Sequence, residues 1–301
     1  MFFLIFIKFG LSLSYRYEFP SCNPNLHNKK DVSTSVRYAR SILSNSSTVI
    51  SDRLAINMIF SHGFLHNSKQ QLDRIPHLQC ALKKVYLNLL PHNELDIFIW
   101  IPQISFDFVP AWLKNGTAYP RTYVMPIINT TWMVPCGIRD EGQWPLRKHF
   151  NLDYHIMGRW RITTGFDFMH DMGYKYYVQL DDDAMINNKI EFNIVQRFRE
   201  KGYQMGVFSD YIGEVPHVTQ GLAELTRYWF SITNFSPTGP LFEHMNPKSI
   251  DGLTSKGWDR YYHPTYFLIT SLDFWFSEIV QDFLTTVLQS GRDVKGGGGI
   301  K

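Results

Sequence analysis

Short apolar runs that alternate with helix-like segments constrain the fold of this chain more than any other feature. The apolar runs occupy residues 54–60, 95–102, 122–127 and 174–180. The helix-like segments occupy residues 74–90, 166–173 and 193–202, and they end at a proline or a glycine. Near-continuous apolar runs are typical of strands buried on both faces. The alternation therefore predicts an α/β domain with a mostly parallel sheet flanked by helices.

The ends of the 301-residue chain differ from its middle. Residues 1–14 are mostly apolar but include Lys8, which favours a secretory signal or an N-terminal membrane anchor, although a spanning helix needs roughly 20 residues. A misplaced start or a buried first strand are the alternatives. We expect a stem-like lead-in up to residue 50 and one domain over 51–301. The glycine-rich tail indicates a flexible terminus or a domain truncated at its C-terminus.

Charge and sequons bear on compartment and partners. The net charge of +3 is too small to indicate a nucleic-acid partner. Asn-x-Ser/Thr triplets occur at Asn45, Asn115, Asn129 and Asn234. Four such triplets beside an apolar N-terminus favour a lumenal chain of the secretory pathway. The three cysteines include no Cys-x-x-Cys pair, so we do not expect a structural zinc site.

Three consecutive carboxylates follow the last apolar run, in "YKYYVQLDDDAMI". Ligands of open α/β sheets bind beyond the carboxyl ends of the strands. Because side chains alternate along a strand, we expect Asp181 and Asp183 to share a face. Two converging carboxylates suit Mn²⁺ or Mg²⁺, which also bind diphosphates. The sequence thus predicts a metal site for a nucleotide diphosphate at Asp181 and Asp183. A solvated acidic turn is the alternative.

Three common catalytic motifs are missing from the sequence. It contains no G-x-x-x-x-G-K-[S/T] loop, no G-x-S-x-G elbow and no H-E-x-x-H segment. Phosphate-loop NTPases, α/β-hydrolases and zincin proteases are therefore disfavoured.

Several segments between about Tyr154 and Leu288 carry a family resemblance. "YHIMGRW" is similar to Y-x-x-M-C-R-[FW], and "YKYYVQLDDDA" to Y-x-Y-Y-W-R-V-E-P-D-V. "YYHPTYFLITSLDFW" is similar to Y-C-H-F-W-S-N-F-E-I-x-x-L-D-F-F. These patterns resemble the fungal α-1,2-mannosyltransferases of glycosyltransferase family 15. Two positions depart from the family: Leu268 stands where it has a candidate nucleophilic Glu, and Tyr266 where it has Asn. The family's downstream E-R-W-G-D-A-P-V-H-S segment has no counterpart before Lys301.

The resemblance implies a GT-A fold, which is a Rossmann-like α/β architecture. It implies GDP-mannose as the donor, Mn²⁺ as the cofactor, retention of anomeric configuration and a type II membrane protein of the Golgi. It places the metal ligands on Asp181 and Asp183. The expected reaction moves a hexose from the nucleotide sugar to a hydroxyl of a glycan or glycoprotein.

Further residues complete the expected site. Arg159 matches the family's Arg and could pair bidentately with the diphosphate, whereas a surface salt bridge is the ordinary role for Arg161. Ser61 follows the first run, where GT-A folds receive the nucleotide, although a plain turn is the simpler interpretation. As catalytic candidates we name Glu214, which could face the acceptor, and His263, which could contact the acceptor or replace a metal ligand.

Two alternatives remain open. Leu268 and the absent downstream segment favour a catalytically inactive GT-A domain that binds a glycan or a protein. A GT-A enzyme of another family would use a UDP-sugar and, if inverting, would need a carboxylate base such as Glu214 or Asp273. Asp273 would otherwise cap the amphipathic helix that follows it.

Overall fold

A six-stranded sheet forms the centre of the molecule. The computed structural model describes residues 29–43, 50–60, 69–114, 118–128, 131–132, 152–207, 211–212, 222–235, 261–262 and 266–290. The strands of the sheet are β1 (Leu54–Ile59), β2 (Leu95–Pro102), β3 (Thr122–Ile127), β4 (Tyr176–Leu180), β5 (Met205–Val207) and β8 (Phe267–Ser271). Their order is β3-β2-β1-β4-β8-β5. The first four are parallel, and β8 runs antiparallel to both of its neighbours. The predicted mostly parallel α/β sheet is confirmed.

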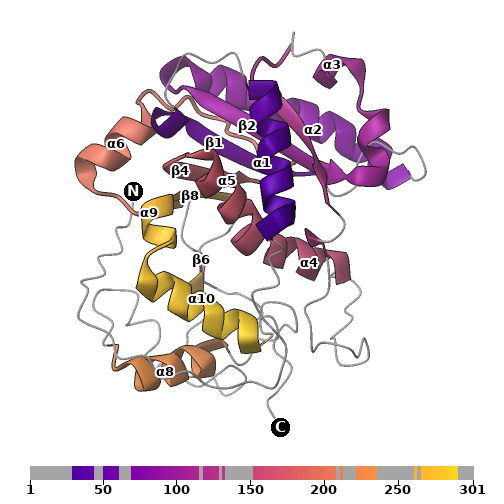
Figure 1. Ribbon diagram of the computed structural model, residues 1–301. Coiled ribbons are helices and arrows are strands. Elements are labelled where there is room, and N and C mark those ends of the chain that lie inside the picture. Colours follow the sequence, from indigo (N-terminus) through magenta and orange to yellow (C-terminus); the bar gives the residue numbers. More distant parts are fainter. Residues whose placement is uncertain are drawn as a thin grey trace.

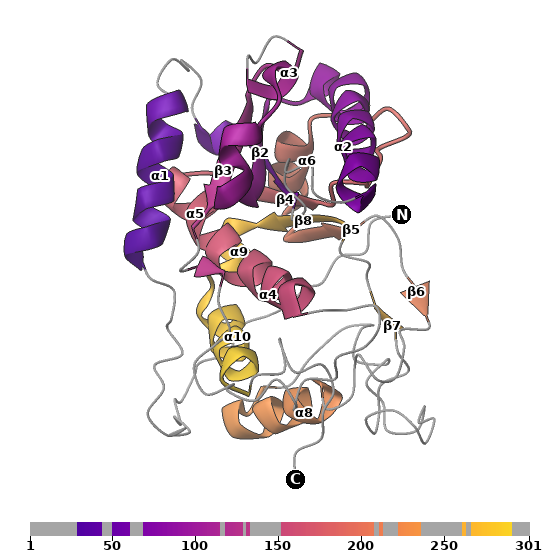
Figure 2. The same ribbon diagram turned by 90° about the vertical axis from the view of Figure 1, so that its right-hand side faces the viewer.

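Helices cover both faces of this sheet (Figures 1 and 2). Apolar residues of α2 (Lys69–Asn88), α3 (Ala111–Lys114) and α6 (Ile194–Lys201) share a core with Leu54 and Ile56 of β1. Residues of α1 (Lys29–Leu43), α4 (Leu152–Trp160) and α5 (Phe166–Met172) share the opposite core with Ala55 and Ile59. Alternate side chains of β1 thus enter two different cores, which explains its continuous apolar sequence. Short 3-10 turns η1 (Ile50–Asp52), η2 (Leu90–His92) and η3 (Gln103–Phe108) link these elements.

Helix α1 corrects the predicted domain boundary. We expected a stem-like lead-in up to residue 50, but residues 29–43 form a helix that packs on the sheet. Its buried residues follow helical spacing on one face: Val32, Val36, Ala39 and Leu43. The folded unit therefore includes part of the segment that its polar composition assigned to a stem.

Two further helices pack against each other outside the sheet. They are α8 (Leu222–Thr233) and α10 (Glu278–Ser290), which face each other below the sheet in Figure 1. Trp229 Nε1 donates a hydrogen bond to Asp282 Oδ2 at 2.7 Å, which joins the two helices. A small antiparallel ribbon pairs β6 (Tyr211–Ile212) with β7 (Tyr261–Tyr262). No helix among the described residues is both long and apolar enough to cross a membrane.

The short helix α9 (Leu272–Trp275) begins directly after β8. The Ser271 side chain caps it by accepting a hydrogen bond from the Phe274 N–H. Asp273 lies within the first turn and pairs with Lys175 at 3.0 Å. We expected Asp273 to cap one long amphipathic helix, but this segment is divided into α9, whose N-cap is Ser271, and α10 (Glu278–Ser290), so that expectation is wrong.

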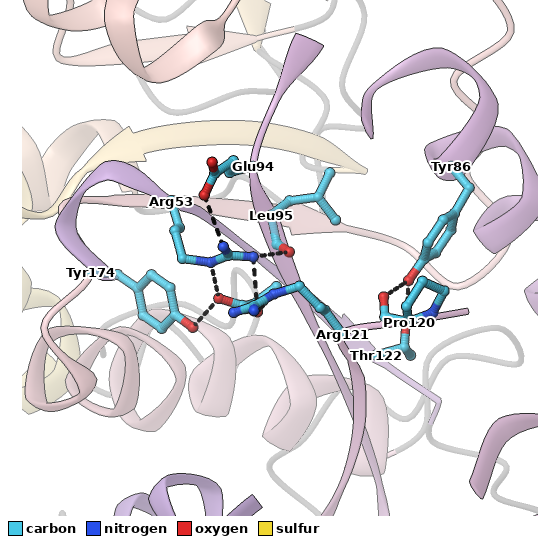
Figure 3. Close-up of polar contacts among 9 residues, drawn as sticks. Arg53, Tyr86, Glu94, Leu95, Pro120, Arg121, Thr122 and Tyr174 are labelled. Carbon is cyan, nitrogen blue, oxygen red and sulfur yellow. Dashed lines mark hydrogen bonds and ion pairs between the residues drawn. The ribbon is translucent and has the colours of Figure 1, made fainter. Parts of the chain in front are cut away.

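Charged groups at the amino ends of the strands form a buried cluster (Figure 3). The carboxylate of Asp96 in β2 accepts a hydrogen bond from Arg53 Nε at 2.7 Å, from Arg121 Nε at 2.8 Å and from Tyr174 Oη at 2.8 Å. Arg53 Nη1 also pairs with Glu94 at 3.0 Å. Asp96 is fully buried, so these donors replace its water. This end of the sheet is held together by its own residues, and the acidic motif lies at the other end.

Candidate functional site

The acidic motif lies at the point where the strand order of the sheet reverses. From β1 the chain proceeds outward to β2 and β3, and it then returns to the other side of β1 as β4. In open α/β sheets this reversal opens a crevice beyond the carboxyl ends of the two central strands, where ligands bind. Asp181 directly follows β4 at this edge. Ser61, which follows β1 in sequence, lies outside the described residues.

The three carboxylates divide between two arginines from opposite layers. Asp181 Oδ1 lies 2.7 Å from Arg161 Nη2. Arg74 bridges the other two, since its Nη1 lies 2.7 Å from Asp183 Oδ2 and its Nη2 donates to Asp182 Oδ1. Asp181 and Asp183, which we expected to share a face, thus have different arginine partners. Strand β4 ends at Leu180, and the turn that follows brings Asp183 to the same arginine as Asp182.

Backbone hydrogen bonds fix the start of this turn. The Asp181 N–H donates to the Tyr266 carbonyl at 3.0 Å, and the Asp181 carbonyl accepts from the Ala184 N–H at 3.0 Å. The first bond ties the acidic motif to the beginning of β8. The position of Asp181 is thus set by neighbouring strands rather than by a free loop.

Arg161 contacts the acidic motif. Arg161 opens the π-helical turn η6 (Arg161–Gly165), which joins α4 to α5. It is buried, so the surface salt bridge expected for it is instead an ion pair largely shielded from water. π-helical turns occur frequently at functional sites because they redirect a side chain within a helix. Arg159 is also buried, two residues earlier in the last turn of α4, and it stays a candidate donor ligand.

A buried polar pair lies within electrostatic range of Arg161 and Asp181. Asn57 of β1 donates a hydrogen bond from Nδ2 to the Tyr177 hydroxyl of β4 at 2.8 Å. Burial raises the pKa of Tyr177 to about 12, so its hydroxyl stays neutral at physiological pH. Arg161 and Asp181 both act electrostatically on this hydroxyl. Gly165 leaves room for the pair, since a Cβ there would lie 3.3 Å from Asn57 Nδ2.

Asp182 is the most deeply buried member of the motif. Its side chain is 6% exposed, whereas that of Asp183 is 45% exposed. Burial raises the pKa of Asp182 to about 6, with further raising by Asp183 and Asp181 and opposition from Arg74. The carboxyl group therefore changes protonation state within reach of physiological pH.

The donor set of the motif suits a hard divalent cation. Asp182 Oδ2 is buried without a hydrogen-bond partner among the described residues. Asp181 Oδ1 is also buried; it lies within ion-pair distance of Arg161 but accepts no hydrogen bond of good geometry from the described residues. Carboxylate oxygens of this kind are the ligands that Mn²⁺ and Mg²⁺ prefer. The described residues do not include a ready cluster of three or more His, Cys, Asp or Glu arranged around one ion. A cation would thus need ligands from elsewhere, such as the donor's phosphates or water.

The charge balance of the motif also indicates that a cation would bind first and an anion after it. The three aspartates outnumber Arg74 and Arg161 by one negative charge. A diphosphate would meet net repulsion from this set, whereas one divalent cation reverses its sign.

Only some of the remaining predicted site residues lie in the described part of the chain. Glu214 and His263 lie outside the described residues, and their catalytic roles stay predictions. Leu268 lies in β8, paired with Gln179 of β4 and with Val207 of β5. An aliphatic side chain therefore occupies the strand position at which the resemblance expected a nucleophilic carboxylate. Asp273 lies at the opposite end of β8, beside Lys175.

The sheet order, the helices on both faces and the acidic motif at the reversal define a GT-A-type glycosyltransferase fold. Among solved structures, the chain is similar to the mannosyltransferase Ktr4p of S. cerevisiae, with a TM-score of 0.68 and 15% identity over 93% of this chain and 74% of the yeast chain. It is also similar to core-mannan synthase A (CmsA/Ktr4) of Aspergillus fumigatus in its Mn/GDP form, with a TM-score of 0.65 and 14% identity over 84% of this chain and 67% of the other. Identities this low show the fold alone.

Comparison at the level of sequence gives no family. No protein-family model matches the chain, and no curated protein sequence matches it either.

Proposed function

We propose that this chain is a nucleotide-sugar glycosyltransferase. In this proposal the carboxylates of Asp181 and Asp183 hold a divalent cation and, through it, the donor's diphosphate. The observation that carries the proposal is the acidic motif, bracketed by Arg74 and Arg161, at the strand-order reversal of a GT-A fold. Arginines beside a cation site suit an anionic ligand because guanidinium groups bind phosphate oxygens bidentately.

The chain's own residues would bind and orient the donor. Arg161 holds Asp181 through Nη2, while its buried Nε has no hydrogen-bond partner among the described residues. The hydrogen-bonded pair of Asn57 and Tyr177 lies within electrostatic range of both groups. A bound Mn²⁺ or Mg²⁺ would supply Lewis-acid neutralisation of the charge that develops on the leaving diphosphate. Glu214 and His263 remain the candidates for acceptor-side chemistry.

GDP-mannose is the donor that we propose, with a glycan or glycoprotein hydroxyl as the acceptor. Support comes from the sequence resemblance and from the two fungal neighbours, one described in a Mn/GDP form and one in complex with GDP. The four sequons and the apolar N-terminus support a place in the Golgi lumen with an N-terminal anchor.

Calorimetric titration with GDP, UDP and their hexose conjugates, with and without Mn²⁺, tests the proposal. We expect Mn²⁺-dependent binding of GDP and of GDP-mannose. Selective binding of UDP or a UDP-sugar would instead support a GT-A enzyme of another family. Absence of binding to every nucleotide would contradict the proposal.

Replacement of Asp183 tests the role of the acidic motif. We expect Asp183→Ala to abolish donor turnover and to weaken Mn²⁺ binding, while the circular dichroism spectrum stays that of the wild type, because Asp183 is half-exposed. Asp52→Ala is the matched control, since that carboxylate pairs with Arg199 on the surface. Undiminished turnover in Asp183→Ala would contradict a metal site at this residue.

Leu268 supports a second candidate, an inactive GT-A domain that binds a glycan or a protein. An aliphatic residue in β8 cannot act as a nucleophile, so this candidate predicts nucleotide or glycan binding without transfer or hydrolysis. Release of free sugar from the bound donor would exclude it.

A further inference from the structure

Arg74 holds two carboxylates of the acidic motif at once. It lies on α2, the helix that follows β1, and reaches across to the turn after β4. One guanidinium nitrogen is 2.7 Å from Asp183, and the second donates to Asp182. The Arg74 side chain is 29% exposed, so it is only partly shielded from water.

The contact with Asp183 competes with the proposed cation. Arg74 Nη1 occupies Asp183 Oδ2, which is one of the oxygens that a cation at Asp183 would use. A guanidinium and a divalent cation on the same oxygen repel each other strongly in a partly buried site. A cation at Asp183 therefore requires that Arg74 release this oxygen.

The released guanidinium would have an anionic partner nearby. Its Nε is buried and has no hydrogen-bond partner among the described residues, so it keeps unused donor capacity. Arg161 lies on the other side of the motif, held by Asp181. The two arginines come from opposite layers of the fold and flank the edge at which a diphosphate would lie.

We propose that Arg74 is a donor-binding residue that exchanges partners: it neutralises Asp182 and Asp183 in the donor-free chain, and it binds the donor's diphosphate once a cation occupies Asp183. This inference rests on the proposed function and deepens it. Nothing in the local sequence around Arg74 indicated such a role.

The exchange has a consequence that separates it from a structural role. Removal of Arg74 takes away a competitor of the cation and a ligand of the diphosphate. Binding of Mn²⁺ alone should therefore become tighter, while binding of the nucleotide in saturating Mn²⁺ should become weaker. A purely structural arginine would weaken both, because its loss would disturb the turn that carries the aspartates.

The test is calorimetry on the wild type, Arg74→Ala and Arg74→Gln at about pH 8, where the carboxylates are ionised. We expect the dissociation constant for Mn²⁺ alone to fall about tenfold in both variants. We expect the dissociation constant for GDP, in saturating Mn²⁺, to rise about tenfold or more. Arg199→Ala is the matched control, because its guanidinium forms a surface ion pair with Asp52 and should leave both constants unchanged. Thermal unfolding of each variant checks that the fold is retained.

The outcomes distinguish the two proposals. A wild type that binds neither GDP nor UDP with Mn²⁺ overturns the proposed function and the exchange with it. Suppose instead that the wild type binds GDP or UDP with Mn²⁺, and that the variants bind both Mn²⁺ and GDP more weakly or with unchanged dissociation constants. That result overturns the exchange alone and leaves the proposed function standing. If Arg74→Ala does not fold, Arg74→Gln gives the same comparison, since it keeps a side chain of similar reach without the charge.

Discussion

Burial of the Asp182 carboxyl group makes its ionisation unfavourable in the metal-free protein. Its pKa is raised to about 6 from an ordinary value of 3.8, mainly by burial. Between these two values the native state keeps a proton that the unfolded chain has released. The contribution of Asp182 to the free energy of unfolding is therefore largest at low pH, and it falls as the pH rises through this window.

Asp182→Asn isolates this effect. We expect the stability of the variant relative to wild type to increase from about pH 4 to about pH 7.5, because the amide cannot ionise. Urea denaturation of both proteins in the presence of a chelator measures the difference at each pH. Parallel pH profiles for the two proteins would contradict the raised pKa of Asp182.

Asp96 is the buried charge whose loss should be most damaging. It accepts hydrogen bonds from Arg53, Arg121 and Tyr174, and Arg53 is itself buried (Figure 3). Asp96→Ala leaves these cations without their main counter-ion, so we expect a loss of about 3–5 kcal/mol in the free energy of unfolding. Chemical denaturation measures this loss.

Asp52→Ala serves as the comparison for Asp96→Ala. Asp52 pairs with Arg199 at 2.6 Å, but both side chains are more than half exposed. Exposed pairs contribute little, so the free energy of unfolding should hardly change. Equal losses in the two variants would show that the Asp96 cluster is not the structural centre that we infer.

At the residue scale, local sequence predicted the aspartates but not their arginine partners. Asp181 to Asp183 stand out because charges follow an apolar run. Arg74 lies more than a hundred residues earlier, and only the packing of α2 against the sheet brings it to the motif. Arg161 lies close to the motif Y-x-x-M-C-R in sequence, but its burial depends on the π-helical turn, which no sequence pattern indicates.

Close packing of α6 against β5 fixes one end of the sheet. Gly206 in β5 has no room for a side chain, because a Cβ would lie 2.8 Å from Cζ of Phe198 in α6. Phe198 cannot move aside easily, since it is buried and packs edge-on against Tyr176 and Tyr203. We expect Gly206→Ala to lower the free energy of unfolding by about 1–3 kcal/mol.

Gly158→Ala is the matched control for this packing. Nothing lies within 4 Å of a Cβ built at Gly158, which is part of helix α4. Alanine favours a helix over glycine by about 1 kcal/mol, so this variant should be neutral or more stable. Thermal unfolding of both variants measures these changes. A Gly206→Ala variant as stable as the wild type would contradict the predicted clash.

At the element scale, the helices and strands with a clear apolar pattern in the sequence could be predicted, and those without one could not. The strands at 54–59, 95–102 and 122–127 agree with the expected ranges within a residue. Gly173 and Gly202 end their helices as expected, and the structure shows that both adopt positive φ. Helix α1 was missed because polar residues surround its four buried ones. Strand β8 was recognised only as part of a family-like segment, since its antiparallel insertion depends on contacts with β4 and β5.

The sequons offer a test of the lumenal proposal for the molecule as a whole. Asn234 is exposed and adopts a positive φ of 52° directly after α8, so an oligosaccharide could be attached there. We expect secreted expression in a eukaryotic host to give a glycosylated chain, and Asn234→Gln to lose the mass of one glycan. Ser236→Ala, which removes the sequon but keeps the Asn, should shift in the same way.

Mass spectrometry before and after glycosidase treatment gives the result. An unmodified Asn234 in chains that have passed through the secretory pathway would contradict glycosylation at this residue. If none of the four sequons carried a glycan, the sequons would no longer support a lumenal chain.

The placement of β8 has a consequence for how the molecule assembles. β5 ends at Val207, yet its partner in the sheet, β8, begins only at Phe267. Strand β8 can pair with β4 and β5 only after the chain has been synthesised past residue 271, whereas β1 and β2 can pair much earlier. The carbonyl of Tyr266 that holds Asp181 arrives with this same strand. During synthesis the acidic motif would therefore leave the ribosome long before it is anchored, and the site would be completed only by the final strand of the sheet.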